Sequence, residues 1–263
     1  MRILCVTGIR SEYDILYPVL TGLKKNNHEL VILASGAHLS DQHNSTYKRI
    51  IEDGFRIDDK VDTLLSTDRA VQRSKGAGLL IQGLTQTVER TDPDFLLVLG
   101  DREESIATAI VGNYMEKLVV HIGGGDPVYG NADDPIRFAV SKLAHIHCCT
   151  AQAYADNLLK IGEEDFRVFF TGNPAYANID FVPVIEKVDL MNQLDIKSEN
   201  YISTNYVINK ENTFGKLPLL LHNFFNYFTN FKKYFKNNIF KGEGFVLNGI
   251  NQSENNNRSF LNN

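Results

Sequence analysis

The sequence predicts an α/β protein with a parallel sheet covered by helices on both faces. Short apolar runs of strand length alternate along the chain with longer segments that carry apolar residues at helical spacing. Most of the short runs are continuously apolar, which is typical of strands buried on both faces. About six such strand–helix units follow one another, and no internal repeat relates them.

The chain begins with a strand followed by a helix. Residues 2–7 form a short β-prone apolar run, and 12–25 carry apolar residues at helical spacing. Ser11 is the expected N-cap of this helix. A strand at 29–34, a turn and a helix around 45–53 follow.

The middle of the chain repeats this alternation. A long helix is predicted at 69–90, and it ends before Pro93 because proline cannot continue the helical hydrogen bonding. The remaining predicted elements are a strand at 95–99, a helix reaching about 115, a strand at 118–122, a helix at 135–144, a strand at 145–150, a helix at 151–161 and a strand at 167–171.

The last part of the chain differs in composition from the rest. Residues 1–200 hold 20 Lys and Arg against 29 Asp and Glu, whereas residues 201–263 hold 7 against 3 together with 15 asparagines. Such an abrupt shift is not expected within one domain. We therefore predict a domain at 1–198 and an irregular tail, rich in Asn, Phe and Lys, at 199–263.

Composition also indicates the cellular compartment and excludes some classes of binding partner. Three cysteines, two of them adjacent, give no disulfide framework, and no signal peptide is recognised, so we expect a cytoplasmic protein. No apolar run approaches the roughly 20 residues of a membrane helix, which predicts no membrane partner. The acidic main body argues against nucleic acid as a partner. A homo-oligomer is compatible with the sequence.

Loops at the carboxyl ends of parallel strands are where ligands bind, so the loops after residues 7, 99, 122 and 171 are informative. Arg10 stands beside a helix start, which suits a phosphate, although a surface salt bridge explains it equally well. Asp101 lies at a strand tip and is the better active-site candidate in its acidic run. Glu103 and Glu104 are explained by the dipole of a helix N-terminus or by solvation.

A glycine triplet follows the strand at 118–122, and an ionisable residue, His121 or Asp126, stands at each end of it. The triplet lets the backbone approach a ligand closely, although a plain tight turn would show the same pattern. Asp133, Asp134 and Arg137 lie at the next helix start, where Asp134 is the expected cap. Converging carboxylates suit proton removal and return, because close like charges separate their pKa values.

Two histidines near two cysteines raise the question of a metal site. His145 and His147 lie in a strand-like segment, and the adjacent Cys148 and Cys149 would point to opposite faces of the sheet. We therefore expect core packing at these positions and no metal. His38, in the loop after the second strand, is a candidate for ligand contact.

The motifs described above recur together, in the same order, in a known family. Residues 7–14, 36–40, 100–103, 121–126, 133–137, 142–147 and 172–174 carry them. Over roughly 1–198 the sequence resembles the hydrolysing UDP-N-acetylglucosamine 2-epimerases, in particular the branch that feeds sialic and legionaminic acid synthesis.

This resemblance implies a GT-B type fold of which residues 1–198 are the N-terminal, Rossmann-like half, with the active site between two domains. It implies a UDP-sugar substrate and no cofactor, neither nicotinamide nor metal. The family reaction removes the proton at C2 of the sugar and expels UDP to give a glycal-type intermediate. Water then adds with inverted configuration at C2, which yields an N-acetylmannosamine-type sugar.

The resemblance also implies roles for individual residues. Carboxylates matching Asp101, Asp126 and Asp133 carry the acid and base steps. Aspartate at 126, where the sialic acid branch often has glutamate, favours a bacillosamine-derived substrate. Residues expected to bind substrate or to support the carboxylates are Arg10, His38, His121, Asp134, Arg137 and Asn173.

The match ends near residue 198. In the family a second domain, which opens with a strand ending in His-Pro, grips the uridine diphosphate, and no His-Pro follows residues 201–207 here. Enrichment in Asn, Lys, Phe and Ile is what an AT-rich coding region gives out of frame, so we hypothesise a frameshift near residue 200 and an impaired epimerase. The alternatives are an inactive fragment or binding module, and a GT-B glycosyltransferase.

Overall fold

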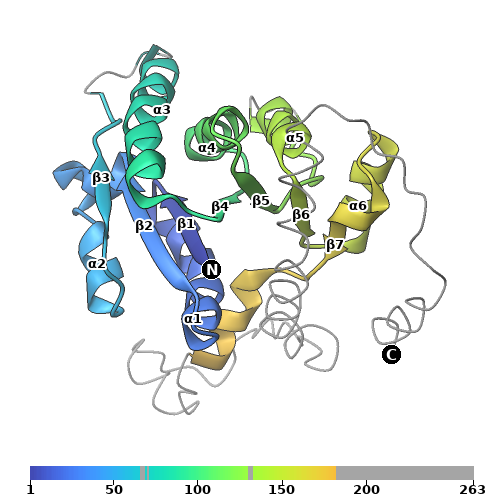
Figure 1. The fold of residues 1–263 in the computed structure, drawn as a ribbon, viewed down its shortest axis with the longest axis horizontal. Coiled ribbons are helices and arrows are strands. Elements are labelled where there is room, and N and C mark those ends of the chain that lie inside the picture. The colour runs from blue at the N-terminus through green and yellow to red at the C-terminus, as the bar shows by residue number, and fades with distance from the viewer. Residues whose placement is uncertain (66–68, 70, 130–132, 182–263) are drawn as a thin grey trace, which may run out of the picture. The chain divides into compact units, whose positions relative to one another are not determined.

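The computed structural model describes residues 1–65, 69, 71–129 and 133–181. Seven parallel strands form one sheet in the order β3-β2-β1-β4-β5-β6-β7 (Figure 1). The strands are β1 (Arg2–Thr7), β2 (Glu29–Ser35), β3 (Asp59–Val61), β4 (Phe95–Leu99), β5 (Leu118–Ile122), β6 (Ile146–Cys149) and β7 (Val168–Phe170). The parallel α/β fold expected from the sequence is confirmed. The tail predicted at 199–263 lies outside the described residues.

Six α-helices and four short 3₁₀ helices are found in the part of the chain that the structure describes. The α-helices are α1 (Arg10–Lys25), α2 (Tyr47–Glu52), α3 (Val71–Thr91), α4 (Glu103–Tyr114), α5 (Asp133–Leu143) and α6 (Gln152–Lys160). The 3₁₀ helices are η1 (Gly36–Leu39), η2 (Asp41–His43), η3 (Asp165–Arg167) and η4 (Pro174–Phe181). In Figure 1, α3, α4 and α5 lie along one face of the sheet and α1 lies on the other.

One apolar cluster joins the sheet to α3, α4 and α5. Its strand residues include Leu4, Val6, Leu33, Leu96, Val98 and Val119, and its helix residues include Leu80, Leu84, Val88, Ala107, Val111 and Val140. The strand residues of this cluster share one face of the sheet. The residues that alternate with them are buried as well, so the strands are covered on both faces: Ile3, Cys5, Ile32, Leu97 and Val120.

On the opposite face, α1 buries an apolar stripe although it contains a proline. Pro18 lies inside the helix, where a missing N–H and a ring clash cost about 3 kcal/mol. Leu16, Val19, Leu20 and Leu23 are each at most 2% exposed, and full burial of such a side chain is worth about 1.5–3 kcal/mol. Their summed burial exceeds the cost of the proline.

The strand order places a topological switch point between β1 and β4. From β1 the chain proceeds through β2 to β3 on one side, and it then crosses to β4 on the other side of β1. The loops after β1 and β4 therefore leave the sheet in opposite directions and open a crevice at its carboxyl edge. The segment after β7 returns to this region, since η4 packs against α1 (Figure 1).

The start of the first helix differs from the sequence prediction. Helix α1 begins at Arg10, with Ile9 as N-cap and no side-chain capping bond, so the assignment of Ser11 as N-cap was wrong. The carboxylate of Glu12 instead accepts a hydrogen bond from the Gly8 N–H at 3.1 Å. Strand β3 was not predicted from the sequence because it has only three residues, including Asp59 and Lys60, at the edge of the sheet.

The cysteines are free thiols, and all three are buried. Cytoplasmic location stays a prediction. None of the helices within the described ranges has the length and apolar character needed to cross a membrane.

Candidate functional site

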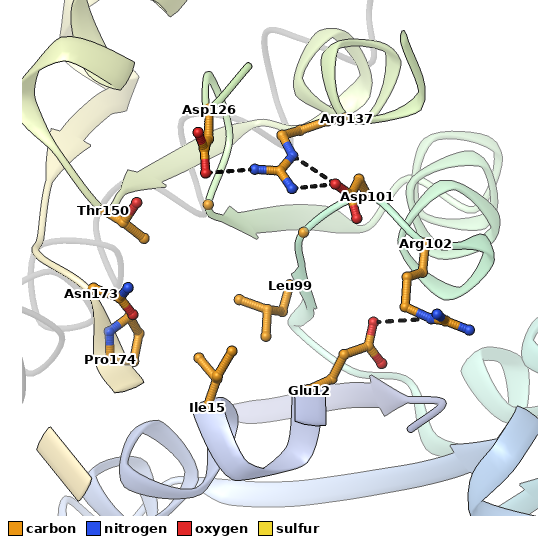
Figure 2. A pocket seen from close by; sticks show the side chains of 12 residues that line it. Glu12, Ile15, Leu99, Asp101, Arg102, Asp126, Arg137, Thr150, Asn173 and Pro174 are labelled. Atoms are coloured by element: carbon orange, nitrogen blue, oxygen red, sulfur yellow. Dashed lines mark hydrogen bonds and ion pairs between the residues drawn. The ribbon is translucent and has the colours of Figure 1, made fainter. Parts of the chain in front are cut away.

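A pocket of about 240 Å³ lies at the carboxyl edge of the sheet, beside the switch point (Figure 2). Its walls come from the first turns of α1, from α5 and from the loops after β4, β5, β6 and β7. The lining residues are Glu12, Ile15, Leu99, Gly100, Asp101, Arg102, Gly123, Asp126, Arg137, Thr150, Asn173 and Pro174. Of the nine site residues predicted from the sequence, four line it: Asp101, Asp126, Arg137 and Asn173.

Arg137 joins two of the predicted carboxylates. Its Nε donates to Asp101 Oδ2 at 3.0 Å, and its Nη2 makes a second, shorter contact with the same oxygen. Its Nη1 lies 3.0 Å from Asp126 Oδ2. The side chains of Arg137 and Asp101 are only 12% and 15% exposed, so this guanidinium fixes both carboxylates on one wall of the pocket.

Asp126 has a second neighbour on α6. Tyr154 hydrogen-bonds the Asp126 carboxylate, and this bond raises the pKa of the Tyr154 hydroxyl. The glycine triplet before Asp126 allows the close approach. A Cβ on Gly125 would lie 2.2 Å from the Tyr154 carbonyl oxygen, and its φ of +78° also favours glycine. The triplet thus serves packing as well as the turn.

Asp133 and Asp134, at the start of α5, do not line the pocket. Asp133 accepts a hydrogen bond from Arg73 at 2.8 Å, and Arg73 also bonds Glu103. Asp134 accepts from the Val128 N–H at 2.7 Å. Since α5 begins at Asp133, Asp134 lies within the first turn, and its predicted role as N-cap was wrong. It ties the loop after β5 to this helix instead.

His121 lies beneath the pocket wall rather than in the pocket. Its side chain is fully buried, with Nε2 2.7 Å from the carbonyl oxygen of Gly100 and Nδ1 3.3 Å from the Ser141 hydroxyl. Burial lowers the pKa of His121 to about 3, so the ring is neutral at neutral pH. The neutral ring links the turn that carries Asp101 to the helix that carries Arg137.

His38 and Arg10 are also placed away from the pocket. The ring of His38 is fully buried, with its nitrogens 3.1 Å from the Thr7 hydroxyl and 2.8 Å from the Thr46 hydroxyl. Burial lowers its pKa to about 4. Arg10 is exposed at the start of α1 and pairs with Asp14 at 3.6 Å, which is the surface salt bridge considered from the sequence. Ligand contact by either residue stays a prediction.

Asn173 reaches the pocket from the loop after β7. Its Oδ1 accepts a hydrogen bond from the Ala175 N–H at 3.0 Å, which fixes the side chain at the start of η4. Figure 2 shows it beside Pro174 and opposite the first turns of α1.

The histidines near the cysteines are packed in the core, as predicted. His145 Nδ1 accepts from the Val119 N–H at 3.1 Å. His147 lies 3.2 Å from Glu163, a fully buried carboxylate that also pairs with Lys142 and Arg167. Within the described ranges no three His, Cys, Asp or Glu side chains gather as metal ligands would.

Two pocket-lining charged residues, Glu12 and Arg102, were not singled out from the sequence, and Glu104 behind them was interpreted wrongly. Glu104 is 5% exposed, so it is neither solvated nor merely compensating the helix dipole. Its carboxylate lies 3.4 Å from Arg102 Nε. The same Nε lies 3.7 Å from the Glu12 carboxylate, and Figure 2 shows these two side chains facing each other. Their positions in the sequence could have identified them, because Glu12 and Glu104 follow the two strands that border the switch point.

Comparison with known proteins identifies the family of the chain. The profile of the UDP-N-acetylglucosamine 2-epimerase family matches residues 21–213. The chain belongs to this family. It is 33% identical over 225 residues to a Campylobacter jejuni protein named GDP/UDP-N,N'-diacetylbacillosamine 2-epimerase (hydrolyzing), covering 84% of this chain and 58% of the relative.

A second curated relative supports this assignment, and a solved structure shows the same fold. The Legionella pneumophila UDP-N,N'-diacetylbacillosamine 2-epimerase (hydrolyzing) is 32% identical over 68% of this epimerase-family chain and 47% of the relative. The Neisseria meningitidis UDP-GlcNAc 2-epimerase bound to UDP-GlcNAc superposes with a TM-score of 0.61 at 21% identity, covering 75% of this chain and 52% of that one. The chain spans about half the length of the relatives it matches. It shares the Rossmann-like half of their fold, as the expected GT-B architecture requires.

Proposed function

We propose that the pocket is part of the active site of a hydrolysing UDP-N-acetylhexosamine 2-epimerase. The side of the pocket that carries Asp101, Asp126 and Arg137 is called the catalytic wall. The observation that carries the proposal is the Asp101–Arg137–Asp126 arrangement, which holds two carboxylates on one pocket wall at the carboxyl edge of a parallel sheet. The names of the Campylobacter and Legionella relatives support the reaction class.

The reaction needs groups that take and return protons at one carbon. One carboxylate accepts the C2 proton, the C–H electron pair forms the C1=C2 double bond, and UDP leaves with the C1–O electron pair. Water then adds its hydroxyl to C1, and C2 receives a proton on the opposite face. Asp101 and Asp126 come from different loops, so they can address the sugar from different directions. Arg137 keeps both in place.

The other predicted residues would act around this pair. Asn173 offers a neutral hydrogen-bonding group to sugar substituents, as does Thr150, a pocket residue that was not predicted from the sequence. His121 and Asp134 would support the loops that carry Asp101 and Asp126. Asp133 would have to turn from Arg73 to reach the sugar, so its catalytic role is the least supported of the three.

We further propose an N,N'-diacetylbacillosamine-type UDP-sugar as substrate, in the sialic or legionaminic acid branch. Support comes from the names of the two relatives and from Asp126. Apolar atoms of Ile15, Leu99 and Pro174 line the pocket on the side opposite the charged side chains (Figure 2). Acetyl or methyl substituents of such a sugar could pack there.

The pocket is smaller than the roughly 300–1,000 Å³ of most ligand sites. This favours a site that further protein completes, since closing a cleft excludes water and holds the diphosphate. Our expectation that the 263-residue chain alone has little activity stays a prediction. Release of UDP from UDP-N-acetylglucosamine by this chain at a rate typical of the family would contradict it.

The catalytic competence of the wall is testable independently of that expectation. A chimera would join residues 1–198 of this chain to the remaining C-terminal part of the Campylobacter relative. It should release UDP and a 2-epimerised sugar in a coupled assay. A thermal shift with UDP and size-exclusion chromatography on the 263-residue chain separate the alternatives, because an inert fragment would remain a monomer with no shift.

A further inference from the structure

A buried pair of glutamates occupies the switch point next to the catalytic wall. Glu104, in the first turn of α4, is 5% exposed, and Glu12, in the first turn of α1, is 8% exposed. The pair is distinct from the Asp101–Arg137–Asp126 arrangement, and neither residue has a role in the reaction proposed above.

Glu104 is wedged between two backbone turns. A Cβ added to Gly8, in the turn after β1, would lie 1.8 Å from Glu104 Oε1, and one added to Gly36, after β2, would lie 2.9 Å from the same atom. The side chain of a residue following β4 thus touches the turns that leave β1 and β2. Glycine at these turns leaves the room that the carboxyl group fills.

Glu12 completes the contact from the other side. Its Oε2 accepts the Gly8 N–H at 3.1 Å, so both glutamates bear on the same turn. Glu12 also lines the pocket, whereas Glu104 does not. A change in the charge of the pair would therefore change the electrostatic potential in the pocket.

Within the described part of the chain, Arg102 is the one cation that pairs with both buried carboxylates, which disfavours two negative charges at this place. Arg102 is 3.4 Å from Glu104, 3.7 Å from Glu12 and 3.8 Å from Glu103, so one guanidinium faces three carboxylates. Arg73 on α3 bonds Glu103 but neither buried glutamate. Two buried carboxylates that share one half-exposed guanidinium favour retention of a proton.

The other described neighbours of the pair, Asp101 and His38, add no positive charge. Asp101 contributes further negative potential at Glu12. The backbone N–H of His38 donates to the Gly8 carbonyl oxygen, and the His38 ring is neutral because burial lowers its pKa. Burial and then the Glu104 carboxylate raise the pKa of Glu12 to about 8, and burial raises that of Glu104 as well.

We propose that Glu12 and Glu104 hold one proton between them at neutral pH and act as a positioning pair that fixes the turn after β1 against the turn that carries Asp101. The shared proton also removes one negative charge from a wall that already holds Asp101 and Asp126. This second consequence rests on the proposed function, because it matters for an anionic diphosphate sugar.

The test is a carboxyl titration of the full 263-residue chain labelled with ¹³C at the glutamate side-chain carboxyl, followed by NMR. One glutamate resonance should titrate at least two pH units above exposed glutamates, which titrate near 4.3. In Glu104→Gln only Glu12 of the pair can still titrate. Its midpoint should lie at least one pH unit below the high midpoint of the wild type. Glu89→Gln, at an exposed position on α3, should leave it unchanged.

Two results would overturn the proposal. One is a wild-type spectrum in which every glutamate titrates below pH 6. The other is a high midpoint that stays unchanged in Glu104→Gln. Because glutamine has the shape of the protonated acid, Glu12→Gln and Glu104→Gln should retain the wild-type amide spectrum at pH 6. If either variant fails to fold, the titration of the wild-type chain still tests the first of these two results. Enzyme activity is not needed, so failure here is distinguishable from failure of the proposed function.

Discussion

Substitution of Gly8 by alanine tests the packing of the switch point most sharply. The added methyl would lie 1.8 Å from Oε1, 2.2 Å from Cδ and 2.8 Å from Cγ of Glu104. Three atoms of one side chain would have to move, and that side chain is 7% exposed. Overpacking of this kind costs about 1–3 kcal/mol.

The gain that opposes this cost is smaller. Gly8 is not among the positive-φ glycines, so alanine would gain about 0.4–1 kcal/mol from the reduced entropy of the unfolded chain. We therefore expect Gly8→Ala to lower the free energy of unfolding by about 1–2 kcal/mol, measured by urea denaturation at pH 7. Gly78→Ala is the matched control, because a Cβ there meets no atom within 4 Å on a helix. It should stabilise by about 0.5–1 kcal/mol.

The double variant isolates the contact. Glu104→Ala removes the atoms that the new methyl would strike, so Gly8→Ala should cost less in that background than in the wild type. A coupling energy of about 1 kcal/mol or more is expected for residues in contact. Equal costs in both backgrounds, or a Gly8→Ala variant as stable as the wild type, would refute the placement of Glu104 against this turn.

Four further predictions follow from the same geometry. Gly125→Ala should destabilise by more than about 2 kcal/mol, seen as a lowered Tm, because it adds a clash with the Tyr154 backbone to an unfavourable φ. Between about pH 5 and pH 8, the unfolding free energy of Glu12→Gln should decrease less with rising pH than that of the wild type. The folded wild-type chain keeps a proton that the unfolded chain has lost in that interval, and comparison of the two proteins cancels the opposite contribution of the buried histidines. Glu163→Gln should cost about 3 kcal/mol at pH 7, and the difference from wild type in urea titrations should shrink as pH falls from about 5 toward 2. Although burial opposes it, hydrogen bonds from His147 and Lys142 lower the pKa of Glu163 to about 2, so its stabilising charge is lost on acidification. Arg137→Met should lower kcat/KM of the chimera by about 10²-fold or more, because Asp101 and Asp126 lose the group that positions them.

The fold was readable from the sequence because its signals are strong and local. Continuous apolar runs such as 95–99 and helical stripes such as that of α1 are fixed by burial on the two faces of the sheet. Strand β3 escaped because three residues with two charges carry no periodicity, and its pairing with β2 decides its conformation.

The site was readable only in part. Asp101 and Asp126 could be found because acidic residues at strand ends have few structural explanations. Glu104 could not, because its sequence position in a first helical turn is equally typical of a solvated acid. What buries it is the space left by Gly8, about a hundred residues away in the chain, and that contact exists only once β1 and β4 are paired.

The central claim is that the wall carrying Asp101 and Asp126 exchanges the C2 proton of a UDP-N-acetylhexosamine. Reaction of the chimera with a UDP-N-acetylhexosamine in D₂O, followed by NMR of the released sugar, measures this directly. We predict UDP release and one deuterium at C2 of the product, with both lost in Asp101→Asn and in Asp126→Asn. A product that retains its original C2 proton, or wild-type turnover in either variant, would contradict the account.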